Sequence, residues 1–126
     1  MAKVRDIMNK HIVAVSKITS VGTAIQLMKR SRVSVVPVLD GKVLFGVLTM
    51  DEAERQIERW GDERNVGSMR LRLLFAEADD KPESAARLMV AHRLNRLPVV
   101  DSASSMHCIG IISSTEIARS HKKKIF

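Results

Sequence analysis

The fold is decided by the stretch VVPVLD at residues 35–40, because it returns as RLPVVD at residues 96–101. The two copies stand 61 positions apart, and other positions recur at the same offset. These positions are Ala24, Leu27, Met28 and Arg32, which return as Ala85, Leu88, Met89 and Arg93. Self-similarity at a fixed spacing predicts two copies of one structural unit.

A second pair of matching segments follows the first. GVLT at residues 46–49 returns as GIIS at residues 110–113, after a three-residue insertion, and Glu52 returns as Glu116. The chain has 126 residues. One half alone, of roughly 60 residues, would bury only about 60% of its surface. We therefore expect the halves to pack on each other and to share a core.

Composition limits the classes of function. Apolar residues make up 45% of the chain, which excludes wholesale disorder. One Trp, three Phe and no Tyr predict an aliphatic core. They also disfavour a surface that stacks single-stranded bases on aromatic rings. The net charge of +7 favours anionic partners, such as nucleotides, nucleic acid, acidic lipid or an acidic protein.

Cysteine content and hydropathy bear on the compartment. A single cysteine excludes an internal disulfide and predicts a reducing environment. No apolar stretch approaches the ~20 residues that a membrane helix needs. The N-terminal stretch MAKVRD lacks the apolar core of a secretion signal. We therefore expect a cytoplasmic protein that makes no membrane contact.

Periodicity and turn residues predict the order β-α-β-β-α in each copy. In the first copy we expect a strand at 11–15, a helix capped by Thr19, a strand at 33–39, a hairpin turn at Asp40-Gly41, a strand at 43–48 and a helix from Thr49 to about Trp60. In the second we expect a strand at 72–76, a helix capped by Asp80 with Pro82 in its first turn, strands at 97–100 and 108–112 around a turn at 101–106, and a helix from Ser113 to about Ser120.

These elements define the expected domains and topology. The domains are a repeat at 1–60, a linker at 61–67, a repeat at 68–120 and a basic, frayed tail at 121–126. A strand–helix–strand crossover makes the first two strands of each repeat parallel, and the hairpin adds an antiparallel strand. The predicted fold class is α/β (α+β), with two β-α-β-β-α repeats packed with pseudo-two-fold symmetry so that each covers the other's bare sheet face.

The repeated segments resemble a tandem pair of cystathionine-β-synthase (CBS) domains, often called a Bateman module. The resemblance is carried by the Pro-containing strand and by the Gly-hydrophobic-hydrophobic-[Ser/Thr] strand end, both present twice, and it covers residues 4–120. It implies a regulatory module that binds an adenosyl ligand (AMP, ADP, ATP or S-adenosylmethionine) in the cleft between the repeats. It also implies an effector partner, such as a fused or separate enzyme or channel, and a homodimer formed through the helices.

The family's nucleotide signature is [Ser/Thr]-x-x-Asp, in which the carboxylate binds the ribose diol and the hydroxyl lies near the phosphate. The matching residues are Thr49 with Glu52 and Ser113 with Glu116, so Glu replaces Asp in both copies. The same pattern is also the capping box of a helix start. Such a cap stabilises a helix by about 0.5–2 kcal/mol. Both interpretations stay open, and they are not exclusive.

The resemblance also implies phosphate-binding and adenine-binding residues. Arg96 stands where phosphate-binding members often carry Arg, with Arg93 and Asn95 close in sequence, whereas the first repeat has Val35 at that place. We expect the second repeat to be the better phosphate site, unless Arg96 is only a solvated residue at a strand end. The adenine positions are Val13, Ala14, Val35, Val36, Leu74, Phe75, Ala76, Arg96 and Leu97, and ordinary core packing is equally open for each.

The remaining residues indicate neither a metal site nor catalysis. The four His residues are dispersed, and Cys108 lies in an apolar run that predicts an unreactive thiol. No P-loop, nucleophile elbow or dinucleotide fingerprint is present, so we expect no enzyme and no cofactor. Trp60 is either a dimer anchor or a lid over the linker. Two other functions stay open: a basic adaptor for nucleic acid, and a structural dimerisation module whose ligand sites are lost.

Overall fold

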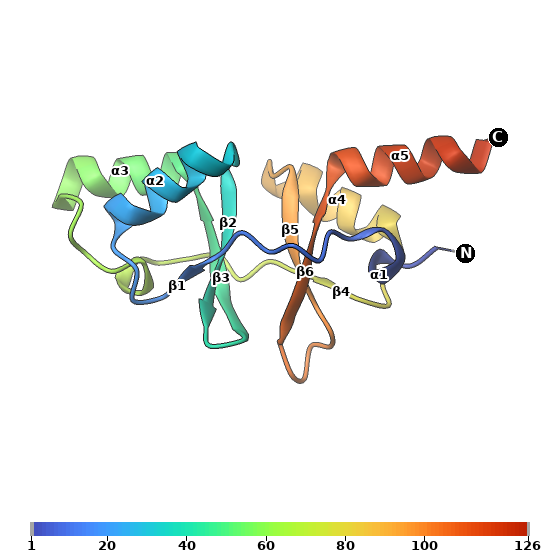
Figure 1. Ribbon diagram of the computed structural model, residues 1–126, viewed down its shortest axis with the longest axis horizontal. Helices are drawn as coiled ribbons and strands as arrows, with labels where there is room; N and C mark the ends of the chain where they lie inside the picture. Colours follow the sequence, from blue (N-terminus) through green and yellow to red (C-terminus); the bar gives the residue numbers. More distant parts are fainter. Residues whose placement is uncertain (1, 126) are drawn as a thin grey trace. The chain divides into compact units, whose positions relative to one another are not determined.

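The computed structural model describes residues 2–125, with side chains described up to residue 121. Apart from two short helices that the sequence did not predict, Val4–Ile7 and Val66–Ser68, the helices and strands follow the predicted order (Figure 1). The helices are α1 (Val4–Ile7), α2 (Val21–Ser31), α3 (Met50–Trp60), the short 3-10 helix η1 (Val66–Ser68), α4 (Pro82–His92) and α5 (Ser114–Ile125). The strands are β1 (Val15–Ser16), β2 (Val35–Asp40), β3 (Val43–Thr49), β4 (Ala76–Glu77), β5 (Arg96–Val100) and β6 (Cys108–Ser113).

Contacts divide the chain into two compact units. The first unit is Val13–Leu73, and the second unit combines Met1–Ile12 with Leu74–Phe126. Each unit therefore contains one complete set of repeated strands and helices. Contacts define these units, whereas sequence similarity defines the repeats, so the repeat boundaries at 1–60 and 68–120 stay a prediction.

Each unit contains a three-stranded sheet with the predicted strand directions. In the first unit β1 runs parallel to β2, with Val15 opposite Val38, and β3 runs antiparallel to β2. In the second unit β4 runs parallel to β5, with Ala76 opposite Val99, and β6 runs antiparallel to β5. The predicted mixed α+β fold, with one crossover and one hairpin per repeat, is confirmed.

Helix α2 buries one stripe of its surface at helical spacing. In α2 the buried positions recur at helical spacing and join β2 and β3 in the core of the first unit. They are Val21, Ala24, Ile25 and Met28. Within the first unit α2 packs beside α3, and within the second unit α4 packs beside α5 (Figure 1). The buried core is aliphatic, as the composition predicts.

The first strand of each repeat is shorter than predicted. The strand expected at 11–15 is reduced to Val15–Ser16, and the one expected at 72–76 to Ala76–Glu77. β-Branched and apolar residues favour an extended backbone, but a strand also needs a hydrogen-bonding partner along its length. Only two residues of β1 pair with β2, and only two of β4 pair with β5.

Two predicted helix caps are wrong. Ser20, rather than Thr19, caps α2, and its hydroxyl accepts a hydrogen bond from the Thr23 N–H at 3.2 Å. Lys81, rather than Asp80, is the N-cap of α4, because Pro82 occupies the first helical position and holds the preceding residue extended. Asp80 instead accepts a hydrogen bond from the Glu77 N–H at 2.9 Å.

The two hairpins differ in their turns. The first has a two-residue turn, Gly41 and Lys42, one position later than predicted, because Asp40 still pairs with Val43. Gly41 supplies the positive φ of 62° that this tight turn requires. The second has a loop at residues 101–107, in which the Ser105 hydroxyl donates to the Asp101 carboxylate. This hydrogen bond is the main cause of a lowered pKa at Asp101.

The last helix is longer than predicted. α5 continues to Ile125 instead of ending near Ser120, so the backbone of the expected frayed tail is helical up to that residue. Propensity explains the difference, since Lys favours a helix and no Gly or Pro interrupts the segment. Within residues 2–125, no helix has both the length and the apolar character to cross a membrane.

A short segment beside each sheet completes the unit. In the second unit α1 lies against α5 and β6, and the Val4 N–H donates to the Asp80 carbonyl at 2.9 Å (Figure 1). In the first unit the corresponding segment is the one around η1, and the Val66 N–H donates to the Thr19 carbonyl at 2.8 Å. Each of these segments then runs on to an isolated bridge with the last strand of its unit.

Candidate functional site

Each signature lies where the last strand of a unit turns into a helix. In the first unit the Thr49 N–H and hydroxyl both donate to Glu52 Oε1, at 3.1 and 2.8 Å, and the Glu52 N–H donates to Thr49 Oγ1 at 3.2 Å. In the second unit the corresponding Ser113 and Glu116 distances are 2.9, 3.0 and 3.2 Å. Both signatures are therefore capping boxes, as the helix-cap interpretation predicts.

The cap leaves chemical capacity for a ligand. In both boxes the reciprocal bonds converge on one carboxylate oxygen, Oε1. An ionised carboxylate has two oxygens and about four acceptor positions. The carboxylate can therefore cap its helix and accept hydrogen bonds from the hydroxyls of a sugar at the same time.

Strand pairing in the second unit brings the predicted phosphate residue to the signature. Arg96, half-buried, begins β5 and lies opposite Ser113 at the end of β6. The Asn95 carbonyl accepts from the Ser114 N–H at 3.0 Å, so the chain before β5 also touches the start of α5. Arg93 is exposed and ends α4 in the left-handed conformation, at φ 56°. Strand pairing therefore brings the backbone of Arg96 to the strand end that carries the hydroxyl of Ser113.

The first unit has the same arrangement without the guanidinium. Val35 is buried and lies opposite Thr49, at the place that Arg96 occupies in the second unit. The neighbouring Val36 is fully buried in the core of the first unit. This end of the sheet is therefore apolar, which favours a base or the core rather than a phosphate.

Of the remaining predicted adenine residues, Leu97 is fully buried in β5, and the others lie at or just before the short first strands. Val13 and Ala14 are half-buried just before β1. Leu74 and Phe75 are half-buried just before β4, and Ala76 is buried as its first residue. Partial burial is compatible with either the rim of a site or ordinary packing, so the role of these residues stays a prediction.

The signature of the first unit contains an ion pair, between Arg72 and Glu52, that the sequence did not predict. Arg72 Nη2 lies 3.6 Å from Glu52 Oε1, with the two side chains 38% and 20% exposed. The Val47 N–H donates to the Arg72 carbonyl at 2.9 Å, which holds this residue beside β3. The sequence predicts no role in the site for Arg72 beyond the start of the strand expected at 72–76, because this residue lies outside both repeated motifs.

The second unit has a neutral residue at the structurally matched place. Asn9 bridges Ile111 of β6 as Arg72 bridges Val47 of β3, and its side chain accepts from the His11 N–H at 2.8 Å. Glu116, which has no ion pair among the described residues, lines a cavity of about 300 Å³. The other lining residues are Asp6, Ile7, Arg119 and Ser120. The sequence carries no signal for this cavity, because α1 and α5 are far apart in the chain.

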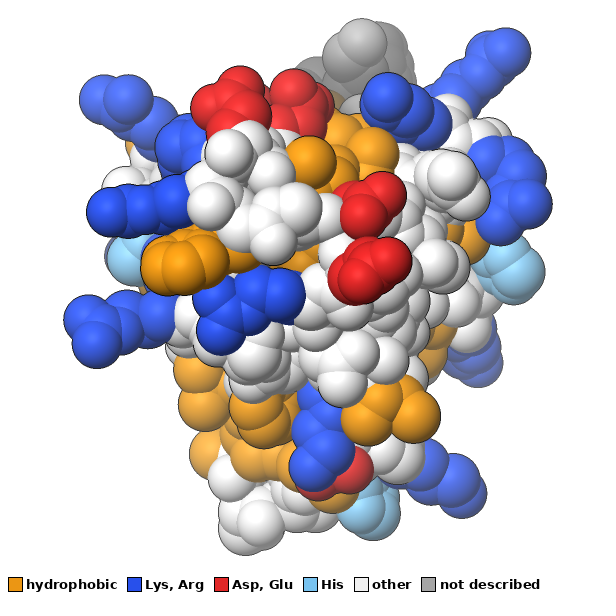
Figure 2. Space-filling model, turned by 90° about the vertical axis from the view of Figure 1, so that its left-hand side faces the viewer, with side chains coloured by type: hydrophobic (Ala, Val, Ile, Leu, Met, Phe, Trp, Pro, Cys, Tyr) orange, Lys and Arg blue, Asp and Glu red, His pale blue; other side chains and the backbone are white. Residues whose placement is uncertain are grey.

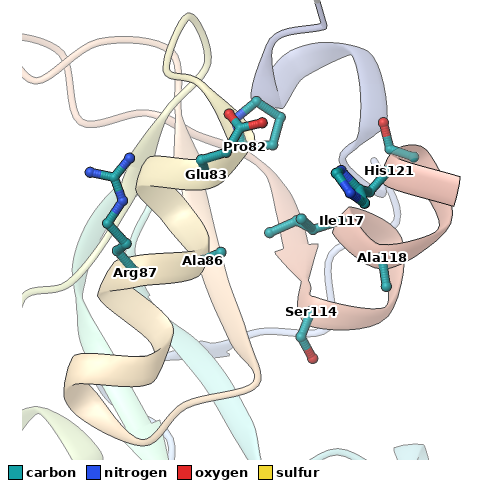
Figure 3. Close-up of a pocket in the computed structure, with 9 residues that line it drawn as sticks. Pro82, Glu83, Ala86, Arg87, Ser114, Ile117, Ala118 and His121 are labelled. Atoms are coloured by element: carbon teal, nitrogen blue, oxygen red, sulfur yellow. The ribbon is translucent and has the colours of Figure 1, made fainter. Parts of the chain in front are cut away.

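A larger groove lies between α4 and α5 of the second unit. It has a volume of about 520 Å³ and is lined mainly by apolar groups, with Ala86 and Ile117 facing it from the two helices (Figure 3). Arg87 extends away from Ile117 on the outer side of α4 in this view. Val90, one helical turn after Ala86, is 80% exposed. The second unit therefore presents an open apolar surface on its helices.

The cysteine, the histidines and the tryptophan lie outside the two signatures. Burial raises the pKa of the half-buried Cys108 thiol, which is the direction of an unreactive side chain. Within the described part of the chain, no three His, Cys, Asp or Glu side chains are grouped to hold a metal ion. Trp60 is exposed, and the Arg64 guanidinium lies 4.9 Å from its ring centre.

The basic composition does not give every face one sign of charge. Figure 2 shows a face on which acidic side chains are interspersed with Lys and Arg, many of which project at the rim. Such a mixed face lacks the continuous positive surface that tracks a phosphate backbone. The basic tail at 121–126 would add to such a surface, but its residues Lys122, Lys123 and Lys124 have side chains outside the described ones.

Comparison with known proteins matches both repeats. The family model described as CBS domain matches residues 4–58 and 64–123. The CBS domain-containing protein YhcV of Bacillus subtilis is 31% identical over 121 residues, which are 94% of this chain and 84% of YhcV. The inosine-5'-monophosphate dehydrogenase of Methanocaldococcus jannaschii is also 31% identical over 121 residues. The match covers 95% of this chain and 24% of that enzyme, so the chain spans about a quarter of its length.

Among solved structures, CBSX2 in complex with AMP is 28% identical. Its TM-score is 0.78, and the match covers 100% of both chains. The likeness therefore extends over both repeats and both signatures.

Proposed function

Because the chain belongs to the CBS domain family, we propose that it is a regulatory module that binds an adenosyl ligand: AMP, ADP, ATP or S-adenosylmethionine. The resemblance drawn from the repeated motifs is confirmed by the family match, and the structure of CBSX2 with AMP supports this ligand class. Binding would shift the equilibrium between conformations of the chain, and an effector partner would respond to that shift.

One observation carries the proposal: the pairing of Arg96 with Ser113 at the start of α5. Because paired residues of an antiparallel sheet project to the same face, this pairing supports a site in which the Arg96 charge would act together with the hydroxyl and carboxylate of the signature. A phosphate or another anionic group would contact Arg96, and the ribose diol would donate to Glu116, whose Oε1 also caps the helix. The apolar side chains before β4 and in β5 would contact the base.

The test separates ligand binding from helix capping. Thermal unfolding of the purified chain is measured with AMP, ADP, ATP, GTP and S-adenosylmethionine, each at millimolar concentration. A ligand present at 100 times its Kd stabilises the folded state by about 2.7 kcal/mol, which is measured as a rise in Tm. Glu116→Gln keeps the capping box but removes the negative charge, so it should weaken binding while leaving the unliganded Tm nearly unchanged.

Arg96→Ala should abolish the preference for phosphate-bearing ligands, and Arg30→Ala, which removes an exposed arginine from α2, is the matched control. If no adenosyl ligand raises the Tm of the wild type, the proposal fails. The two glutamates would then be helix caps only, and the structural dimerisation module would become the preferred interpretation.

We also propose that the chain forms a homodimer through its helices. The groove between α4 and α5, with the 80% exposed Val90 beside it, supports this assembly, because such an apolar surface gains stability when a second copy covers it. Analytical ultracentrifugation should give a dimer for the wild type and a monomer for Val90→Glu. A monomeric wild type at tens of micromolar would contradict this assembly.

A further inference from the structure

We propose that Arg72 is an internal competitor for the Glu52 carboxylate and makes the first unit the weaker of two sites for the ribose diol of a ligand. This inference rests on the proposed function, because it concerns the same signature. Arg72 Nη2 lies 3.6 Å from the oxygen of Glu52 that also accepts both Thr49 bonds. A diol that donates to this carboxylate must share it with the guanidinium or displace it.

The backbone explains why Arg72 stays in this place. Its carbonyl accepts the Val47 N–H at 2.9 Å, and the preceding residue, Leu71, packs over Gly46 so closely that a Cβ on Gly46 would lie 2.8 Å from the Leu71 Cβ. Both contacts belong to β3, the strand that ends at the signature. The main chain of Arg72 is therefore held beside β3, so that its side chain starts close to Glu52, which it reaches through the ion pair.

The second unit shows what the signature looks like without the competitor. Asn9 occupies the matched bridge with Ile111, and its side-chain oxygen is engaged by the His11 N–H. Glu116 keeps the same cap distances as Glu52 to within 0.2 Å and borders a cavity of about 300 Å³. The caps are the same and the neighbours differ, so the difference in binding is predicted to come from Arg72.

The size of the effect follows from the exposure of the pair. Both side chains are partly exposed. Ion pairs of this kind stabilise a protein by an amount that changes an equilibrium constant by a factor of up to about five. Removing Arg72 should therefore tighten diol binding in the first unit by roughly twofold to fivefold. Arg72→Lys, which keeps the charge but not the planar fork, should give an intermediate result.

The experiment isolates the first unit and separates the diol from the phosphate. Adenosine and AMP are titrated calorimetrically into Glu116→Gln, in which binding at the second signature is weakened, and into Glu116→Gln combined with Arg72→Ala. Adenosine carries the diol without a phosphate. The matched control combines Glu116→Gln with Arg70→Ala, which removes an exposed arginine two residues earlier and lowers the net charge equally.

We expect Arg72→Ala to tighten the binding of both adenosine and AMP, whereas Arg70→Ala leaves the binding of adenosine unchanged. Unchanged adenosine binding overturns the inference. Weaker AMP with unchanged adenosine also overturns it, because Arg72 would then be a phosphate contact. If neither double variant binds adenosine or AMP, the inference is overturned as well. If in that case the wild type binds and Glu116→Gln abolishes the binding, the proposed function still stands. Arg72→Gln replaces Arg72→Ala if the latter lowers the Tm.

Discussion

The two strand-to-helix junctions, Thr49 to Glu52 and Ser113 to Glu116, have the same local structure and different surroundings. Both form the same reciprocal hydrogen bonds, yet one carboxylate meets Arg72 and the other borders a cavity. Local sequence specifies a cap because its partners are three residues apart. Which charge stands beside that cap depends on a segment that joins the sheet from elsewhere in the chain. A repeated motif therefore does not imply two equal sites.

The largest effect is expected when the same buried side chain is truncated in each unit, which tests whether the two cores are equally stable. Met28 and Met89 are equivalent in the repeat and are 0% and 2% exposed. Met28→Ala and Met89→Ala should each lower the free energy of unfolding by about 2–5 kcal/mol, because each leaves a cavity. Urea denaturation measures the loss. A loss below about 1 kcal/mol in one variant only would show that this unit repacks where the other does not.

A smaller effect is expected at the glycines under the two bridging segments. A Cβ on Gly46 would lie 2.8 Å from the Leu71 Cβ, and one on Gly110 would lie 2.6 Å from the Met8 Sδ. Each Ala variant should be destabilised by about 1–3 kcal/mol, because overpacking forces the segment away from its strand. Gly46→Ala should be the worse one, since a Cβ is fixed to the backbone whereas a methionine sulfur can rotate away. Equal losses in chemical denaturation would contradict that ranking.

The caps should be equivalent even though their neighbours are not. Thr49→Ala and Ser113→Ala each remove the hydroxyl that accepts the Glu N–H, and each should cost about 0.5–2 kcal/mol. Thermal denaturation of the unliganded variants measures this cost. A Thr49→Ala loss that clearly exceeds the Ser113→Ala loss would mean that Arg72 depends on the intact cap for its position.

The smallest effect concerns the charged contacts of α1 in the second unit. The hydrogen bond and charge of Arg5, 2.9 Å away, lower the pKa of Asp79, and Lys3 adds to this. A carboxyl with a depressed folded-state pKa stabilises the fold above its unfolded pKa, near 4, and loses that contribution as the pH falls through the folded value. Arg5→Ala should raise the pKa of Asp79 in an NMR titration. An unchanged titration would show that the contact is not maintained in solution.

The repeat and its turn residues predicted much of the fold correctly. Strand directions, the capping of α3 by Thr49 and the buried stripe of α2 all follow from short-range patterns, and the structure has each of them. Errors occurred where a neighbour decides the outcome. β1 is short because only Val15 and Ser16 pair with β2. Lys81 is the N-cap of α4 because Pro82 follows it.

The candidate site divides in the same way. Glu52, Glu116 and Arg96 could be selected from the sequence, because the motif that contains them occurs in both repeats. Arg72 could not, because the offset of 61 positions matches Asn9 with Arg70, whereas the bridges to β3 and β6 match Asn9 with Arg72. This two-residue shift can be found only from the bridges that the two segments form with β3 and β6.

Hydrophobic spacing, the two repeated motifs and the capping residues were sufficient for the order of the elements, the sheet topology and the family, because these depend on residues within a few positions of one another. The length of the first strands, the ion pair at Glu52 and the cavity at Glu116 depended on the packed structure. The physical reason is that pairing, ion pairs and cavities require two segments to meet, and no local pattern in this chain records that Arg72 would meet Glu52 or that α1 would lie against α5.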